Sequence, residues 1–275
     1  MWILVNGSAF VLYLLASFLA RPRGGRARAT QASGEHSYRD AATVAMLLAW
    51  LAHASSFVLV LQGLHDPDFG FAPALSLTFW LVAAVYWVES LYYPLQGLRS
   101  WICLLAAISL LLTWFFPGDR LAPPGAGIAF SLHWAMGIAA YGLFGAAVLH
   151  GFMLWSADRA LHRRRPTLAG LGPALPLLTL EKLTYRLAAL GFALLTASLL
   201  FAISFSERLF GHAFELNHQT VFAVAAWLLF AVLLLGRGVL GWRGRQALRW
   251  LFSGSALLLL SYVGSRFVLQ VILHR

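Results

Sequence analysis

Long runs of apolar residues, separated by short polar segments, dominate the pattern of this chain. About eight of these runs approach or exceed the roughly 20 residues that a helix needs to cross the hydrocarbon core of a bilayer. Gly, Pro and charged residues gather between them, as in RPRGGRAR at 21–28 and FPGDRLAPPGAG at 116–127. The pattern predicts an all-α, polytopic membrane helical bundle of about eight transmembrane helices, forming one integral membrane domain over residues 1–275. The predicted spans are about 2–20, 41–62, 72–91, 99–116, 127–155, 185–206, 218–236 and 247–273.

The distribution of charge between the runs predicts their orientation. Of the 20 Lys and Arg residues, 16 lie in or beside every second connection, and the remaining connections carry most of the acidic residues. Basic connections stay on the cytoplasmic side of a membrane, so both termini are predicted on the outer, periplasmic side. The first basic cluster follows the first apolar run instead of preceding it, which favours a retained first span over a cleaved signal peptide. No organelle transit peptide is recognised near the N-terminus, which agrees with the inner membrane of a bacterium as the expected location.

Composition supports the membrane class. Hydrophobic residues make up 60% of the chain and charged residues 11%, whereas a soluble domain carries about 25% charged residues. The formal net charge of +10 is therefore explained by the basic connections that set the orientation of the spans, and binding to nucleic acid is not expected. The single cysteine, Cys103, lies within an apolar run, so we expect a small buried side chain without a disulfide or a thiolate metal cluster.

Two histidines are placed where a leucine would serve equally well. His133 lies near the start of the fifth run, and His218 begins the seventh run. Both runs are predicted to pass from outside to inside, so both imidazoles lie near the outer surface. Helices packed 8–10 Å apart can present two histidines to the two faces of a haem, whose iron takes one axial ligand on each side. The alternatives are packing at helix ends, and a small metal such as zinc with His212 as a third ligand.

Other ionisable residues also fall within the runs, where they mark candidate functional sites. His53, near the middle of the second run, is a candidate cofactor ligand or a hydrogen-bonding partner of a neighbouring helix. Arg266, in the last run, is a candidate clamp for a haem propionate, although snorkelling to water explains it equally well. His150 lies 17 residues beyond His133, too far along the helix to share its site. Glu89 is interpreted as a residue at the inner interface.

Aromatic residues and one long connection complete the pattern. Four tryptophans lie inside the runs, where they either line a flat apolar pocket or pack between helices. The segment at about 156–184 is the longest connection, and its Pro and Gly residues predict a short interfacial segment instead of a span. The tryptophans are Trp50, Trp80, Trp134 and Trp227.

Several motifs resemble those of a known family. SLHWAMGIAAYGLFGAAVLHGFML at 131–154, and the later segment at 217–269 that begins NHQTVF and ends YVGSRFVL, resemble the cytochrome c assembly membrane proteins of the CcsA/CcmC/HemX-like superfamily. The likeness is clearest over 130–270. LAWLAHA and LSLTFW, nearer the N-terminus, resemble the YpjD-like branch. The resemblance implies that outward-facing histidines, matched here by His133 and His218, are axial ligands to haem iron. The Trp-rich WWxWD motif of haem-handling members is absent from 206–217.

Together these observations predict a haem-binding membrane protein that assists the biogenesis of cytochrome c or of respiratory complexes. The haem is expected to be b-type, either resident or in transit, and the protein is expected to be an assembly factor without catalytic activity. Membrane lipid and other assembly or respiratory membrane proteins are the expected partners. One alternative is a non-haem regulatory or scaffold protein linked to tetrapyrrole metabolism. A second is a transporter of haem or a small solute, a class that more often shows inverted repeats and broken helices.

Overall fold

The computed structural model describes residues 2–21, 32–61, 70–118, 128–163, 175–206 and 217–273. These residues form helices joined by turns, with no strand among them. Eight of the helices in the described ranges are long and apolar enough to cross a membrane, which confirms the predicted helical membrane bundle. The helices are α1 (Trp2–Leu19), α2 (Ala32–Leu61), α3 (Phe71–Ser90), α4 (Gln96–Phe115), α5 (Ile128–Arg163), α6 (Leu177–Ser204), α8 (His218–Leu240) and α9 (Gly244–Leu259), and the last span continues through η2 (Leu260–Gly264), α10 (Ser265–Phe267) and η3 (Val268–Ile272).

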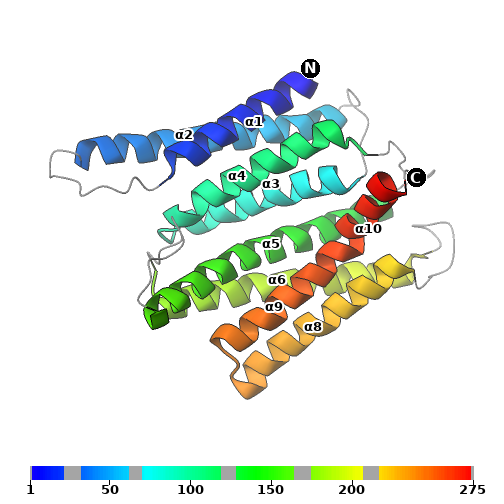
Figure 1. Ribbon diagram of the computed structural model, residues 1–275. Coiled ribbons are helices and arrows are strands. Elements are labelled where there is room, and N and C mark those ends of the chain that lie inside the picture. The colour runs from blue at the N-terminus through cyan, green and yellow to red at the C-terminus, as the bar shows by residue number, and fades with distance from the viewer. Residues whose placement is uncertain are drawn as a thin grey trace.

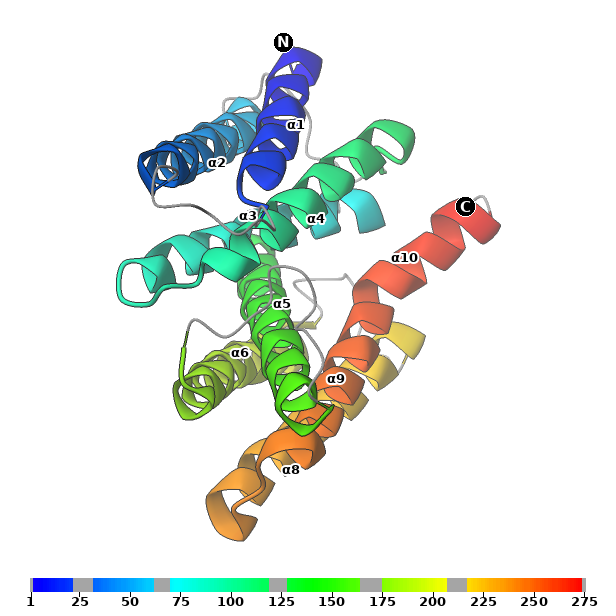
Figure 2. The ribbon, with the colours of Figure 1, turned by 60° about the vertical axis from the view of Figure 1, so that its left-hand side comes forward.

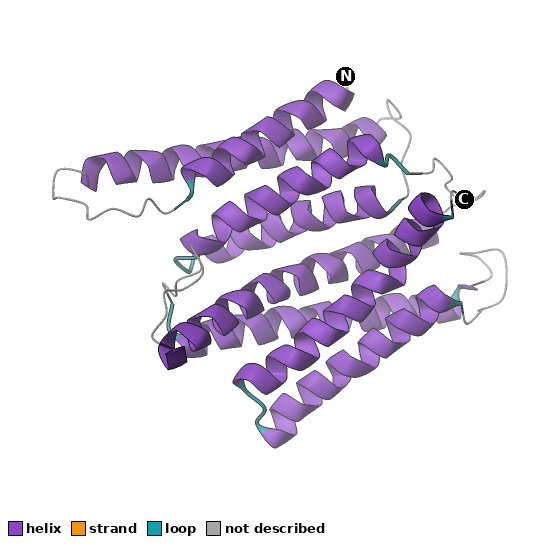
Figure 3. Cartoon of the chain, viewed as in Figure 1, coloured by secondary structure: helices purple, strands orange, loops and turns teal. Residues whose placement is uncertain are grey.

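Successive spans run antiparallel (Figures 1 and 2). α1 packs against α2 and α4, α3 packs against α4 and α5, and α5 also packs against α6 and α9. α8 lies against α9, η2 and α6. The start of α1 and the end of the last span lie at the same end of the bundle, here named the terminal end (Figure 3). Its orientation relative to the membrane stays a prediction from charge.

The helices α5 and α6 are longer than the sequence indicated. The predicted bounds of the connection at about 156–184 are wrong on both sides, because α5 continues to Arg163 and α6 already begins at Leu177. Pro176 directly precedes α6, a place where a missing N–H does no harm because the first turn of a helix has no partners for its amide protons. The buried Glu181 in the first turns of α6 is stabilised by a partner on another helix, which the sequence pattern did not reveal.

Two tryptophans join α2 to α3. The rings of Trp50 and Trp80 are stacked, with centroids 4.9 Å apart and planes 4° from parallel. The indole N–H of Trp50 donates to the carbonyl of Trp80 over 3.1 Å, and the indole N–H of Trp80 donates to the carbonyl of Trp50 over 3.2 Å. These two residues therefore pack helices together, in agreement with the packing alternative. Trp227 acts in the same way, donating to the Thr196 hydroxyl over 2.8 Å.

Changing Trp80 tests this reciprocal pair. We expect Trp80→Phe to lower the free energy of unfolding by about 1 kcal/mol, because the ring still stacks while one hydrogen bond is lost. Trp80→Ala removes the stacking as well and is expected to lower it by about 3 kcal/mol. Chemical denaturation in detergent measures both values. Trp101→Phe is the control, because Trp101 is exposed on α4; equal losses in Trp80→Phe and Trp101→Phe would contradict the assignment.

Candidate functional site

The position of His133 is fixed by α6. His133 lies in the second turn of α5, half-buried, and its Nδ1 is 3.2 Å from the backbone carbonyl oxygen of Ser198. The Ser198 hydroxyl lies at the same distance from Nδ1. A carbonyl oxygen only accepts hydrogen bonds, so this contact assigns the ring proton to Nδ1 and the basic lone pair to Nε2. Metal-ligating histidines commonly donate their second ring N–H in this way, which orients the ring.

His218 is the first residue of α8 and is exposed at the terminal end. The preceding residue, Asn217, caps the helix: its side-chain oxygen accepts from the backbone N–H of Thr220 over 2.9 Å. This cap sets where α8 begins and so where the imidazole of His218 emerges. α5 and α8 run in the same direction and both contact α6. The structure thus brings His133 and His218 to the same end of the bundle, on different helices.

Arg266 lies in the same half of the molecule, within an irregular last span. The Tyr141 hydroxyl donates to the Leu258 carbonyl, and the Ser265 hydroxyl donates to the Leu260 carbonyl over 3.1 Å. Side chains that bond to helix carbonyls disturb the regular ladder, and here π-helical turns lie on both sides of Arg266. The half-buried guanidinium of Arg266 lies 5.9 Å from the ring centroid of Tyr262. These π-helical turns set the direction in which the side chain of Arg266 projects from its helix.

His53 lies in a different environment. It is 1% exposed on α2, and its Nε2 lies 2.9 Å from the hydroxyl oxygen of Ser76 on α3. Its ring also contacts Tyr13 edge-on, with centroids 5.9 Å apart, and Phe57 at 5.3 Å. The structure therefore places His53 among α1, α2 and α3 and does not bring it together with His133. Of the two interpretations given above, these contacts favour a hydrogen bond between neighbouring helices.

The donor set suits an iron with two axial histidines better than a protein-ligated metal ion. Within the described ranges, no group of three or more His, Cys, Asp or Glu residues is arranged to hold a metal ion. His212, the third ligand in the zinc alternative, lies outside the described residues. Cys103 is fully buried in α4, as expected for a small apolar side chain. A haem supplies four nitrogen ligands of its own, so its iron would need only two protein ligands, such as the imidazoles of His133 and His218 at this end of the bundle.

Two polar pairs between helices were missed in the sequence, where their members appeared unrelated. Glu89 on α3 lies 3.2 Å from His150 on α5, measured from Oε2 to Nε2. Glu181 on α6 lies 2.5 Å from Arg237 on α8, measured from Oε1 to Nη1, and the guanidinium stacks 3.7 Å from the ring centroid of Tyr185. Both pairs lie in the half of the bundle away from the terminal end. The sequence signal for these pairs was the presence of acidic residues inside or beside apolar runs, because a buried carboxylate requires a partner.

The fold and the histidines define a polytopic membrane protein with two candidate axial ligands for haem iron at one end. A model of the cytochrome c assembly protein family matches residues 41–273, and the chain belongs to this family. The activity after which this family is named is the assembly of cytochrome c. The predicted family is therefore confirmed.

The relatives agree with this assignment. Inner membrane protein YpjD of Escherichia coli (strain K12) is 28% identical over 179 residues, which cover 63% of this chain and 66% of YpjD, just under two thirds of its length. The cytochrome c biogenesis protein CcsA of Synechocystis is 30% identical over 86 residues, covering 31% of this chain and 26% of CcsA. No solved structure matches the chain. The YpjD-like branch and a multi-pass inner membrane location, both predicted, are confirmed.

Proposed function

We propose that this chain is a haem-binding membrane protein that assists the biogenesis of cytochrome c or of respiratory complexes. His133 and His218 hold the haem iron near the terminal end. The observation that carries the proposal is the contact between Nδ1 of His133 and the Ser198 carbonyl, 3.2 Å long. It fixes the ring by a backbone group of another helix and leaves Nε2 as the basic nitrogen, which is the arrangement that an axial ligand needs.

The surrounding residues support this role in two ways. An apolar cluster at the terminal end includes Phe71 on α3, Ile138 on α5 and Val263 on the last span, with Trp134 packed against it. Such walls exclude water and strengthen the charge interactions beside them. Arg266 supplies a cation for a haem propionate, which it can pair with two parallel hydrogen bonds. When bound, haem supplies the iron centre, and the residues of this chain hold and orient it.

The visible absorption spectrum tests the proposal. The full chain is expressed with excess haem, purified in detergent, and measured oxidised and reduced, with a pyridine haemochrome assay for haem type and content. We expect a b-type spectrum with about one haem per chain. A colourless protein would refute the haem site and would favour the non-haem scaffold alternative. If the haem-loaded protein loses its haem when it is mixed with apocytochrome c, the haem is in transit and not resident.

A further inference from the structure

The two buried polar pairs between helices differ in one chemical respect. In the pair Glu181–Arg237 the guanidinium is always protonated, so this ion pair has a fixed composition. In the pair Glu89–His150 both members exchange protons. Whether the imidazole and the carboxyl attract or repel one another therefore depends on how many protons the pair holds.

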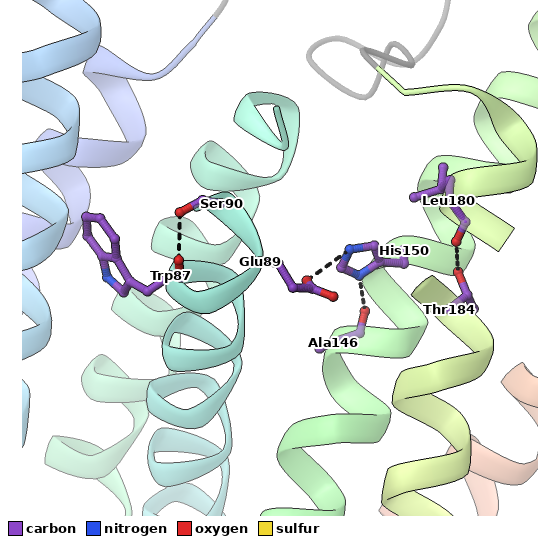
Figure 4. Close-up of polar contacts among 7 residues, drawn as sticks. All are labelled: Trp87, Glu89, Ser90, Ala146, His150, Leu180 and Thr184. Atoms are coloured by element: carbon purple, nitrogen blue, oxygen red, sulfur yellow. Dashed lines mark hydrogen bonds and ion pairs between the residues drawn. The ribbon is translucent and has the colours of Figure 1, made fainter. Parts of the chain in front are cut away.

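The geometry of His150 limits that number. Nδ1 of His150 lies 2.8 Å from the backbone carbonyl oxygen of Ala146, one turn earlier in α5 (Figure 4). The carbonyl can only accept, so Nδ1 carries a hydrogen and donates it. In a neutral imidazole this leaves Nε2 with a lone pair and no proton. Nε2 can offer a proton to Glu89 only as part of an imidazolium.

Glu89 faces this nitrogen directly. Its Oε2 is 3.2 Å from Nε2, and the side chains of Glu89 and His150 are 11% and 3% exposed. A neutral imidazole beside an ionised carboxylate would place two lone-pair atoms at contact distance in a buried site, which is strongly unfavourable. The two atoms are close enough for an ion pair but not aligned as a hydrogen bond, so a favourable contact requires a proton on one of them.

The neighbouring side chains described on α3, α4 and α5 do not take over the role of the proton between Glu89 and His150. Leu98 and Ile102 on α4 line the space beside Glu89 and His150. Tyr86, one turn before Glu89 on α3, accepts a hydrogen bond on its hydroxyl from Nε of Arg99 over 3.0 Å. Arg99 is thus a cation on this side, and Tyr86 and the buried Cys103 on α4 are further titratable groups beside it.

The helices on the remaining sides present mainly apolar or bonded groups. On α6, Leu180 and Thr184 lie beside α5, and the Thr184 hydroxyl donates to the Leu180 carbonyl over 2.8 Å (Figure 4). On α9, Leu248 and Leu251 approach α5 at Gly151, directly after His150. Among the described residues, a favourable contact between Glu89 and His150 therefore requires a proton on one of the two side chains.

We propose that Glu89 and His150 form a proton-binding site that holds one proton between α3 and α5. The proton is shared as imidazolium with carboxylate or as imidazole with carboxylic acid, and in both forms the pair is neutral overall. The site lies in the opposite half of the bundle from His133 and His218 and does not depend on haem binding. Gain of a second proton or loss of the first leaves a net charge buried between the two helices, so proton binding controls the α3–α5 contact.

Magnetic resonance can count the protons. The full chain, labelled with 15N in histidine rings and 13C in glutamate carboxyl groups, is measured in lipid nanodiscs at neutral pH. Glu89→Gln and His150→Gln identify the two signals by their loss. We expect either an imidazolium with an ionised carboxylate or a neutral imidazole with a carboxylic acid. A neutral imidazole with an ionised carboxylate, or protons on both groups, would overturn the proposal.

Two variants separate proton binding from a merely structural contact. Glu89→Gln supplies a permanent N–H donor to Nε2, so His150 is expected to be neutral in this variant under the conditions in which the wild-type pair is measured. An imidazolium that persists in Glu89→Gln would mean that another group holds the proton, which would also overturn the proposal. The matched control is Glu181, whose carboxyl signal is expected to stay ionised throughout because its partner is Arg237.

Discussion

Replacing His133 with alanine is expected to reduce the haem content of the purified protein at least about tenfold. Its imidazole is the proposed ligand whose ring is oriented by another helix, through the Ser198 carbonyl. Changing even a partner that orients a ligand commonly weakens metal binding by about 10–100-fold, and removal of the ligand itself is expected to have at least as large an effect. The pyridine haemochrome assay measures the content, and the reduced absorption spectrum reports any haem that remains.

Two companion variants sharpen this experiment. His218→Ala is expected to remove the second axial ligand and to change the spectrum from that of a bis-histidine haem. Ser198→Ala removes the hydroxyl but keeps the carbonyl that fixes Nδ1, so its haem affinity is expected to fall by no more than about fivefold, since one neutral hydrogen bond contributes only about 1 kcal/mol. Full haem content in a folded His133→Ala protein would show that His133 is not a ligand.

Replacing Arg237 with alanine is expected to lower the free energy of unfolding by about 3 kcal/mol. Removing one partner of a buried ion pair is strongly destabilising because the remaining charge is left without compensation. Here the remaining charge is the carboxylate of Glu181, whose side chain is 10% exposed. The change also removes the stacking of the guanidinium on Tyr185, 3.7 Å from its ring centroid. Denaturant unfolding in detergent gives the value.

A double-mutant cycle separates the unpaired charge from the loss of contact. Arg237→Leu combined with Glu181→Leu removes both charges, and replacement of a buried ion pair by apolar residues is often neutral or stabilising. We expect the double variant to be within about 1 kcal/mol of the wild type, and each single variant to be clearly less stable. If the double variant loses as much stability as the sum of the two single variants, the pair makes no coupled contribution and the reason given for Arg237→Ala is wrong.

The membrane architecture could be predicted from the sequence because a span is a local property. Each helix needs only a sufficient run of apolar residues. The predicted run at about 2–20 ends one residue beyond α1, and the run at about 72–91 is offset from α3 by one residue at each end. The placement of His133 and His218 at one end also followed from the sequence, since the fifth and seventh spans of an antiparallel bundle run in the same direction. Family membership followed from the motifs that carry these two histidines.

What only the tertiary structure decided is which side chains face one another. The apolar pattern of a buried span is nearly uniform around its axis, so it does not specify the rotation of the helix or the neighbour that receives each polar group. For this reason the sequence indicates only that Glu89 is an interfacial residue and that His150 is too far from His133 to share its site, although Glu89 and His150 meet at 3.2 Å between α3 and α5. The pairing of His53 with Ser76 could not be predicted for the same reason. The sequence alone therefore determined the spans, their alternation and the family, while the packing of helix against helix determined which polar side chains meet between the spans.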